Sequence, residues 1–247
     1  MSATPVRDFD EGFERWVEPS LGPIIFEYGY RQALADGVIA PLSLHNFRFS
    51  LTELEEERYD DLSRKITRRW AQVDNPHEDD VLKRLLFRRA GISIESGRRI
   101  IACVAVAERY EGQGIIFHER IAAAEKIARI LDRRGERVAL YHSQLGPTIR
   151  RRNLELFRFG QVSKLVTCRA LDEGLNVPDA EVAIIGASTK STRQRIQRLG
   201  RVVRPTPHKK TALVCTLYAT ESERETLLAE QDRMEDSAEV RWYEVKS

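Results

Sequence analysis

Short apolar runs alternate with longer helix-forming segments through the second half of the chain, and this pattern restricts the fold more than any other feature. The apolar runs lie at 115–118, 138–141, 164–167, 181–185 and 211–218, and helix-forming segments end near 131 or span 147–159 and 192–199. Strands that alternate with helices favour a parallel sheet covered on both faces. The sequence therefore predicts a doubly wound α/β core.

The first half of the chain departs from this pattern. Proline and glycine recur through residues 1–40, which suits a connecting segment with one short helix near 30–35, and a β-rich run follows at 42–51. Residues 53–108 are charge-dense and helix-forming, with breaks near 74–76 and at Gly91 and Gly97. We expect a basic helical insertion there, and a solvated helix face is the ordinary alternative. Its candidate nucleic-acid ligands are Arg64, Lys65, Arg68 and Arg69.

Charge is unevenly distributed along the chain. The 247 residues carry a net charge of only +2, yet residues 182–220 contain no Asp or Glu and eight Lys or Arg. Nucleic-acid binding depends on such local patches more than on total charge. The three cysteines are far apart without CxxC spacing, which suggests neither a disulfide framework nor a zinc site. Without an apolar run of membrane length or a signal peptide, we expect a cytoplasmic protein, nucleoid-associated if prokaryotic.

The most specific signal is the run QRIQRLGRVVRP at residues 194–205. Arg198, Arg201 and Arg204 recur at every third residue, about one helical turn apart. Guanidinium groups this close repel one another unless an anion binds them, and their planar forks suit phosphate oxygens. Pairing with acidic residues elsewhere in the fold is the alternative, although the surrounding sequence contains none. The run indicates a phosphate-binding site.

Several runs resemble the ordered motifs of superfamily 2 helicases. Residues 197–205, QRLGRVVRP, resemble motif VI, residues 165–185 resemble motif V, and residues 114–120, GIIFHER, resemble motif IV. Residues 141–160 resemble the stretch between motifs IV and V, and residues 2–5 resemble motif III. The order and spacing cover nearly the whole chain and are most similar to the XPB-type repair helicases. The resemblance implies a RecA-like second motor domain at 41–247, with residues 1–40 closing the first motor domain and linking the two.

In that family, ATP lies between two RecA-like domains. The resemblance implies that Arg201 and Arg204 are arginine fingers that stabilise the transferring phosphoryl group, an effect worth roughly 10³ or more in rate. It also implies nucleotide contacts from Gln197, Arg198, Gly174 and Asn176. Asn176 stands where an acidic residue is common, so it would contribute hydrogen bonds without charge.

The resemblance also implies contacts with the nucleic-acid strand. The candidates are Thr167, Cys168, His118, His142 and Arg150. Cys168 stands where relatives usually offer a hydroxyl, and a buried structural thiol is the alternative. The two histidines end predicted strands on the edge where α/β sheets place ligand loops, and ordinary core or surface histidines are the alternative. Arg150 lies near the start of a predicted helix, where phosphate is favoured, or forms part of a solvated basic face.

The phosphate-binding half of an ATP site is missing from the sequence. No GxxxxGK[ST] motif occurs, and Asp172-Glu173 fits motif V better than a Mg²⁺-binding Walker B element. We therefore expect ATP and Mg²⁺ to be held mainly by an N-terminal helicase half, in cis or on a separate chain, and this chain alone to be inactive. The further expected partners are DNA and a repair protein or nuclease. An RNA helicase, a restriction-type translocase and a non-catalytic nucleic-acid-binding module remain alternatives.

Overall fold

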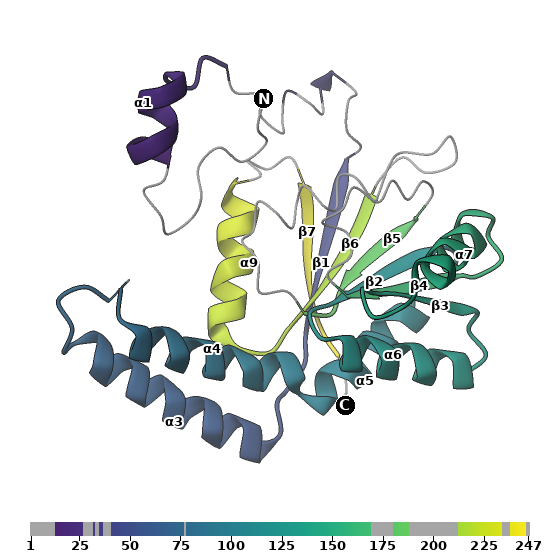
Figure 1. Ribbon diagram of the computed structural model, residues 1–247. Coiled ribbons are helices and arrows are strands. Elements are labelled where there is room, and N and C mark those ends of the chain that lie inside the picture. The colour runs from purple at the N-terminus through teal and green to yellow at the C-terminus, as the bar shows by residue number, and fades with distance from the viewer. Residues whose placement is uncertain are drawn as a thin grey trace.

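The computed structural model describes residues 13–26, 32, 35–36, 41–76, 78–168, 180–187, 212–233 and 238–245. Within these ranges the chain forms a seven-stranded parallel sheet with the order β3-β4-β2-β5-β6-β1-β7 (Figure 1). The strands are β1 (Leu42–Arg48), β2 (Gly114–His118), β3 (Val138–Tyr141), β4 (Lys164–Cys168), β5 (Val182–Ile185), β6 (Ala212–Tyr218) and β7 (Ala238–Glu244). The prediction of a RecA-like parallel α/β sheet is confirmed. The helix predicted at 192–199 lies outside the described residues.

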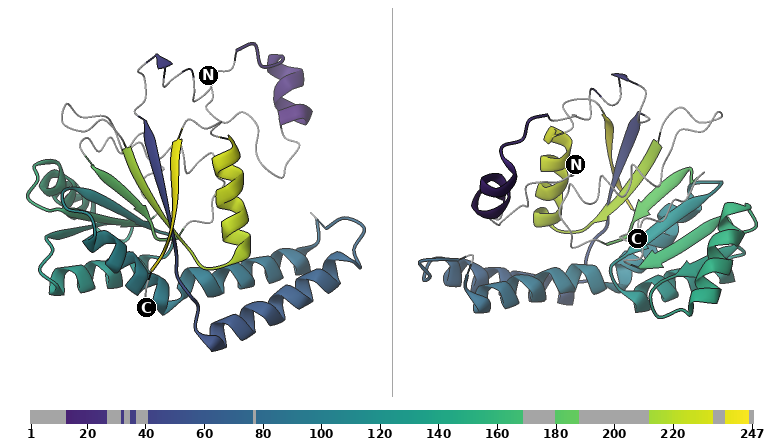
Figure 2. Two further views of the ribbon diagram at one scale, coloured as in Figure 1. Left: turned by 180° about the vertical axis from the view of Figure 1, so that it is seen from behind. Right: turned by 45° about the horizontal axis from the view of Figure 1, so that its top comes forward.

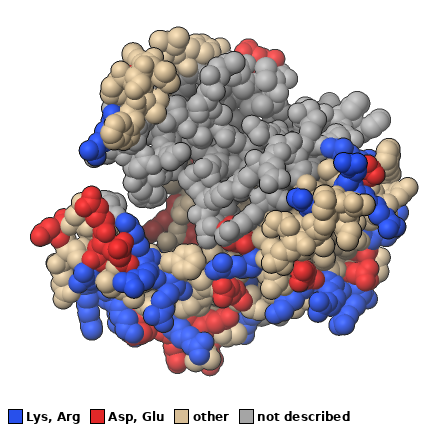
Figure 3. Space-filling view, viewed as in Figure 1, with Lys and Arg blue, Asp and Glu red and all other residues tan. Residues whose placement is uncertain are grey.

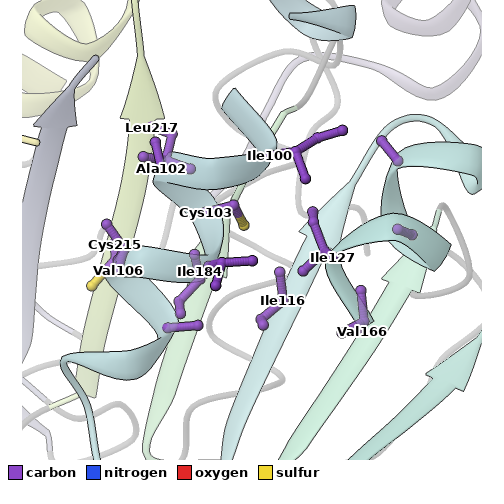
Figure 4. Packing of buried hydrophobic residues seen from close by; sticks show 14 of the residues in the cluster. Ile100, Ala102, Cys103, Val106, Ile116, Ile127, Val166, Ile184, Cys215 and Leu217 are labelled. Atoms are coloured by element: carbon purple, nitrogen blue, oxygen red, sulfur yellow. The ribbon is translucent and has the colours of Figure 1, made fainter. Parts of the chain in front are cut away.

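Alternate residues of the central strands face opposite layers of the core. Ile116 of β2 packs in one apolar cluster, together with α5 (Gly97–Glu108) and α6 (Ile121–Arg133), whereas Ile115 packs in a second cluster with α7 (Pro147–Arg158). Figure 4 shows Cys103 and Val106 of α5 resting against Ile184 and Cys215 of the sheet. Because strands covered on both faces bury every side chain, their sequences are continuous apolar runs.

A helical hairpin formed by α3 (Glu53–Trp70) and α4 (Asp80–Glu95) extends beyond the sheet (Figures 1 and 2). Local signals fix where both helices begin. Thr52 and Glu55 form a reciprocal capping box at the start of α3, and the Asp79 carboxylate accepts from the Leu82 N–H at 2.6 Å at the start of α4. The third helix of residues 53–108, α5, differs from these two because Cys103, Val104 and Ala107 are fully buried on the sheet. The projecting element is therefore the α3–α4 hairpin alone.

Three further described helices lie outside the layers that cover the central strands. Helix α9 (Glu221–Arg233) lies beside the edge strand β7, and the Arg224 guanidinium is 5.9 Å from the centre of the Trp242 ring. At the other end of the sequence, the short helices η1 (Phe13–Val17) and α1 (Glu18–Leu21) stand apart from the sheet in both views of Figure 2. Among the described helices, none has both the length and the apolar character needed to cross a membrane.

Candidate nucleic-acid interface

Three neighbouring strands bring the predicted strand-contacting residues to one edge of the sheet. His118 at the end of β2 is the register partner of Cys168 at the end of β4, and Thr167 pairs with Tyr141 at the end of β3. His142 follows Tyr141 directly, so it lies level with Cys168. This is the carboxyl edge of a parallel sheet, where α/β proteins bind their ligands.

Buried polar atoms without hydrogen-bond partners concentrate at this edge. We use the name polar edge for the five residues that carry six of the seven such atoms found in the described parts of the chain, namely His118, Arg120, His142, Arg150 and Thr167. More than about nine in ten buried polar groups are normally paired, and each exception costs roughly 1–3 kcal/mol. Such a concentration therefore marks this edge as the candidate site for a polar ligand.

The opposite, amino edge of the sheet shows the ordinary arrangement. Lys164 at the start of β4 is buried, and its Nζ donates to the carbonyl oxygens of Tyr110 at 2.7 Å and Gly112 at 2.8 Å. At this edge the protein thus provides hydrogen-bond acceptors even for a buried cation. The contrast places the candidate site at the carboxyl edge.

His118 presents a neutral donor. Its Nδ1 accepts a hydrogen bond from the backbone N–H of Arg120 at 3.1 Å, so the ring proton is assigned to Nε2, the atom without a partner. Burial, assisted by the positive charge of Arg99, lowers the pKa of His118 to about 3. The side chain therefore remains an uncharged N–H donor at neutral pH.

His142 is 1% exposed, and neither ring nitrogen has a hydrogen-bond partner among the described residues. Its Nε2 lies 3.6 Å from Oε1 of Glu125 on α6, which is too long for a hydrogen bond. A phosphate oxygen or a water molecule could complete either nitrogen. His142 therefore presents two ring nitrogens without hydrogen bonds to the described residues, and its contact with nucleic acid stays a prediction.

The start of α7 adds positive potential to the same region. Gly146 precedes the helix without a side-chain cap, and Asn153 anchors α7 to β3 by donating to the Leu140 carbonyl at 2.8 Å. The Arg150 guanidinium lies 6.0 Å from the centre of the Tyr141 ring, and its Nε lacks a partner. Uncapped N–H groups, the helix dipole and a guanidinium together favour an anion.

Thr167 and Cys168 have different environments despite being neighbours. The Thr167 hydroxyl has no partner, whereas the Cys168 thiol donates to the Glu119 carbonyl oxygen at 3.2 Å and is buried in the core. These surroundings favour a structural role for Cys168 and leave Thr167 as the hydroxyl available to a ligand. Sequence reasoning named both residues and left the choice between them open.

The candidate residues of the helical hairpin also divide in two. Arg69 and Lys65 are engaged in ion pairs of 2.6 Å with Asp79 and Asp61, and Arg64 lies 3.9 Å from Asp61. Arg68 is exposed and has no ion pair within the described residues. Figure 3 shows Lys and Arg side chains gathered along the hairpin, with acidic residues interspersed.

Two features of the structure near this edge escaped sequence reasoning. Arg120, within the motif IV run, contributes an unpartnered Nε to the polar edge, and Arg99 of α5 is almost completely buried. A charged residue beside a strand end gave a signal for Arg120, but Arg99 looked like one of many arginines in a charged segment. The predicted nucleotide contacts lie outside the described residues: Gly174, Asn176, Gln197, Arg198, Arg201 and Arg204.

Both motif-bearing segments nevertheless leave from this edge. Residues 169–179 follow β4 at Cys168, and residues 188–211 follow β5, whose last residue is Ile185. Since β4 and β5 run parallel to β2, their carboxyl ends share the side of the sheet that holds the polar edge.

Comparison with known proteins identifies the class of this domain. Residues 96–206 match the family model of the helicase conserved C-terminal domain. The C-terminal domain of a SWI2/SNF2 ATPase from Sulfolobus solfataricus has the same fold, with a TM-score of 0.54 at 15% identity over 77% of this chain and 86% of that one. The C-terminal domain of the DEAD-box protein Dbp5 gives a TM-score of 0.52 at 19% identity over 62% and 86%. Residues 96–206 are therefore similar to a helicase C-terminal domain, in agreement with the resemblance to superfamily 2 motifs.

Within this class the domain is XPB-like. The chain is 27% identical over 222 residues to the DNA 3'-5' translocase XPB2 of Sulfurisphaera tokodaii, covering 83% of this chain and 49% of the relative. The chain spans about half, or less, of the length of the curated relatives that it matches.

Proposed function

We propose that this chain is the second motor domain of an ATP-dependent DNA helicase or translocase that acts in DNA repair. The domain would supply part of the DNA groove and the arginine fingers of a shared ATP site. The observation that carries this proposal is the polar edge, where buried donors without protein partners meet the start of α7. The relatives' DNA helicase names support the choice of nucleic acid.

The polar edge suits the phosphate backbone of a strand. The His118 Nε2–H and the Thr167 hydroxyl are neutral donors, and Arg150 adds a guanidinium. Phosphate oxygens accept from all three groups, and such contacts fix the register of a strand without reading its bases. A motor that moves along DNA needs contacts of this sequence-independent kind.

The helical hairpin would provide a second, more exposed grip. Arg68 is the best candidate of the four predicted basic residues, because it forms no ion pair within the described residues and acts on Asp61 only through its charge, beyond ion-pair distance. Lys65 and Arg64 share Asp61, which reduces the charge they offer to DNA. Exposed cations of this kind bind with strong salt dependence, because counterions are released from the DNA.

The nucleotide role rests on the sequence motifs. Arg201 and Arg204 would contact the γ-phosphate, with Gln197, Arg198, Gly174 and Asn176 near the nucleotide, while ATP and Mg²⁺ would be held mainly by the N-terminal half. Hydrolysis of bound ATP would supply the free energy for movement. This chain would stabilise the charge that develops on the transferring group. We accordingly infer that the isolated chain does not hydrolyse ATP.

Two other functions fit parts of the same evidence. An RNA helicase or a restriction-type translocase would use the same phosphate contacts, since nothing at the polar edge distinguishes ribose from deoxyribose. A non-catalytic nucleic-acid-binding module is favoured by Asn176 and by the engaged thiol of Cys168, but the motif VI arginines oppose it. A repair protein or nuclease is the further partner class that fits the DNA repair proposal.

Reconstitution tests the proposal directly. ATP hydrolysis would be measured for this chain, for its ATP-binding half and for the mixture, each with and without single- and double-stranded DNA and RNA. We expect DNA-stimulated turnover in the mixture alone. If this chain alone hydrolyses ATP and Arg201→Ala abolishes that turnover, the split ATP site is refuted. If only RNA stimulates turnover in the mixture, the substrate is RNA rather than DNA. If the mixture binds nucleic acid without turnover, the non-catalytic module is supported.

A further inference from the structure

Arg99 is a buried junction between four parts of the domain. The residue is 1% exposed, and all of its guanidinium nitrogens are engaged. Nε donates to the Ser93 carbonyl at 2.7 Å, and Nη1 donates to the carbonyls of Gly186 at 2.7 Å and Leu217 at 3.1 Å. Nη2 donates to the Glu223 carboxylate at 2.5 Å and to the Ser93 hydroxyl. Arg99 thus joins the end of α4, the ends of β5 and β6, and the start of α9.

Only an arginine fits this position. Five hydrogen bonds in different directions require the rigid planar fork of a guanidinium, whereas a lysine ammonium offers three donors from one point. The Arg99 Cζ also lies 4.7 Å from the centre of the Phe49 ring, which covers the guanidinium. The position of the fork is therefore fixed from several sides.

Gly186, one of the carbonyls that Arg99 holds, is itself fixed from both sides. Its N–H donates to the Phe117 carbonyl of β2 at 2.8 Å. A Cβ at this position would lie 3.0 Å from that oxygen and 3.2 Å from Cys103 Sγ, so a side chain would be crowded. Gly186 precedes Ala187, the last described residue before the segment that carries the motif VI arginines.

The helical hairpin reaches the same edge through α4. Ser93 lies in the last turn of α4 and contacts both Arg99 and Glu223. Nearby, the Arg120 guanidinium pairs with Glu95 at 3.0 Å. A displacement of α4 relative to the sheet would therefore break or shift the Ser93–Arg99 hydrogen bonds, and Arg99 also holds the end of β5.

We propose that Arg99 is a positioning residue that couples the helical hairpin to the point at Gly186 from which the arginine-bearing segment departs. This proposal rests on the motor function proposed above. When DNA holds the hairpin, Arg99 keeps the Gly186 carbonyl in one place, and the segment after it starts from a fixed position. Without the Arg99 guanidinium, the helical hairpin still binds DNA but no longer fixes the position of the Gly186 carbonyl.

Arg99→Lys, with Arg98→Lys as the matched control, tests this coupling. Arg98 is exposed and, among the described residues, donates to the Leu51 carbonyl alone, at 3.0 Å. We expect Arg99→Lys to speed hydrogen exchange in the peptide that begins at Gly186, measured on the full chain. With the ATP-binding half present, turnover at saturating DNA should fall about tenfold, while nucleotide-free DNA affinity changes less than about twofold. In the Arg98→Lys control, hydrogen exchange, turnover and DNA affinity should all match those of the wild type.

Unchanged turnover in Arg99→Lys overturns the coupling. If Arg99→Lys fails to fold, Ser93→Ala decides, because it removes the hydroxyl contacts from α4 and retains the bonds to Gly186 and Leu217. We expect Ser93→Ala to reduce the stimulation of turnover by DNA and to leave basal turnover unchanged, and wild-type stimulation overturns the proposal. If the wild-type pair shows no DNA-stimulated turnover, the motor function fails. In that case, hydrogen exchange of the peptide that begins at Gly186 still tests the positioning role. It is measured in Arg99→Lys, or in Ser93→Ala if Arg99→Lys does not fold.

Discussion

Arg69 at the end of α3 and Asp79 at the start of α4 form two parallel hydrogen bonds, Nε to Oδ1 at 3.2 Å and Nη2 to Oδ2 at 2.6 Å. The same carboxylate caps α4. The pair therefore closes the helical hairpin, and this arrangement separates Arg69 from its neighbour Arg68.

Replacing the two arginines one at a time should give opposite results. Arg68→Ala should weaken DNA binding and reduce the salt slope of log affinity by about one, because one phosphate contact is lost. Arg69→Ala should lower the unfolding temperature and change the salt slope less. DNA affinity against salt, with thermal unfolding of each variant, makes the comparison. A larger loss of binding in a well-folded Arg69→Ala than in Arg68→Ala would contradict this division.

The Asp79 carboxylate also predicts an acid-sensitive hairpin. Hydrogen bonds from Arg69, and then from the Leu82 backbone, lower the pKa of Asp79. A group with a lowered folded-state pKa stabilises the protein above its unfolded pKa, near 4, and this contribution is lost as pH falls through the folded value. Thermal unfolding between pH 7 and 3 should show a smaller acid-induced loss of stability in Asp79→Asn than in the wild type. Equal losses would exclude this role.

Thr167→Val should improve stability while it harms binding. The substitution keeps the shape of the side chain and removes a buried hydroxyl that lacks a partner, so the unfolding temperature should stay equal or rise. DNA affinity should fall about five- to tenfold if the hydroxyl donates to a phosphate. Thr226→Val, at an exposed position of α9 whose hydroxyl donates to the Ser222 carbonyl among the described residues, is the control. Unchanged DNA affinity in Thr167→Val would remove this hydroxyl from the interface.

His118 should make the fold less stable below neutral pH. Burial lowers the pKa of His118 to about 3, so between that value and about 6.5 the unfolded chain binds a proton that the folded chain does not. Stability therefore decreases as pH falls through this window, by at most about 1.4 kcal/mol per pH unit for one proton. Urea unfolding at pH 7 and pH 5 should show a smaller difference in His118→Gln than in the wild type. An identical difference would mean that His118 titrates normally.

The motif VI arginines should affect turnover and spare DNA binding. In the reconstituted motor, Arg201→Ala or Arg204→Ala should reduce ATP hydrolysis by roughly 10³ or more, because charge on the transferring phosphoryl group loses its partner. Nucleotide-free DNA affinity should remain close to that of the wild type. ATPase rates at saturating DNA and binding isotherms without nucleotide provide the two measurements. Lost DNA binding with retained turnover would reverse the assignment.

The sequence determined the parts of this protein that depend on local pattern. Buried strands such as Gly114–His118 must be apolar on both faces, and the helices between them must be long enough to cross the sheet, so the parallel α/β core was readable from residue order. Motif order predicted the helicase class, and the positions of His118 and His142 at strand ends predicted a shared ligand-binding edge. Edge strand β7 (Ala238–Glu244) was not predicted, since none of its residues is fully buried and it lacks the continuous apolar run of the central strands.

Tertiary structure decided which charged residues are free to act. Arg68 and Arg69 are adjacent and chemically identical, yet only Arg69 lies opposite Asp79, which is ten positions away. Cys168 and Thr167 are adjacent as well, but the carbonyl of Glu119 engages only the thiol. Arg99 acquires its contacts from Gly186, Leu217 and Glu223, all more than 80 residues away. Hydrogen bonding depends on distances of about 3 Å between atoms that folding brings together, and no local pattern in the sequence encodes those distances.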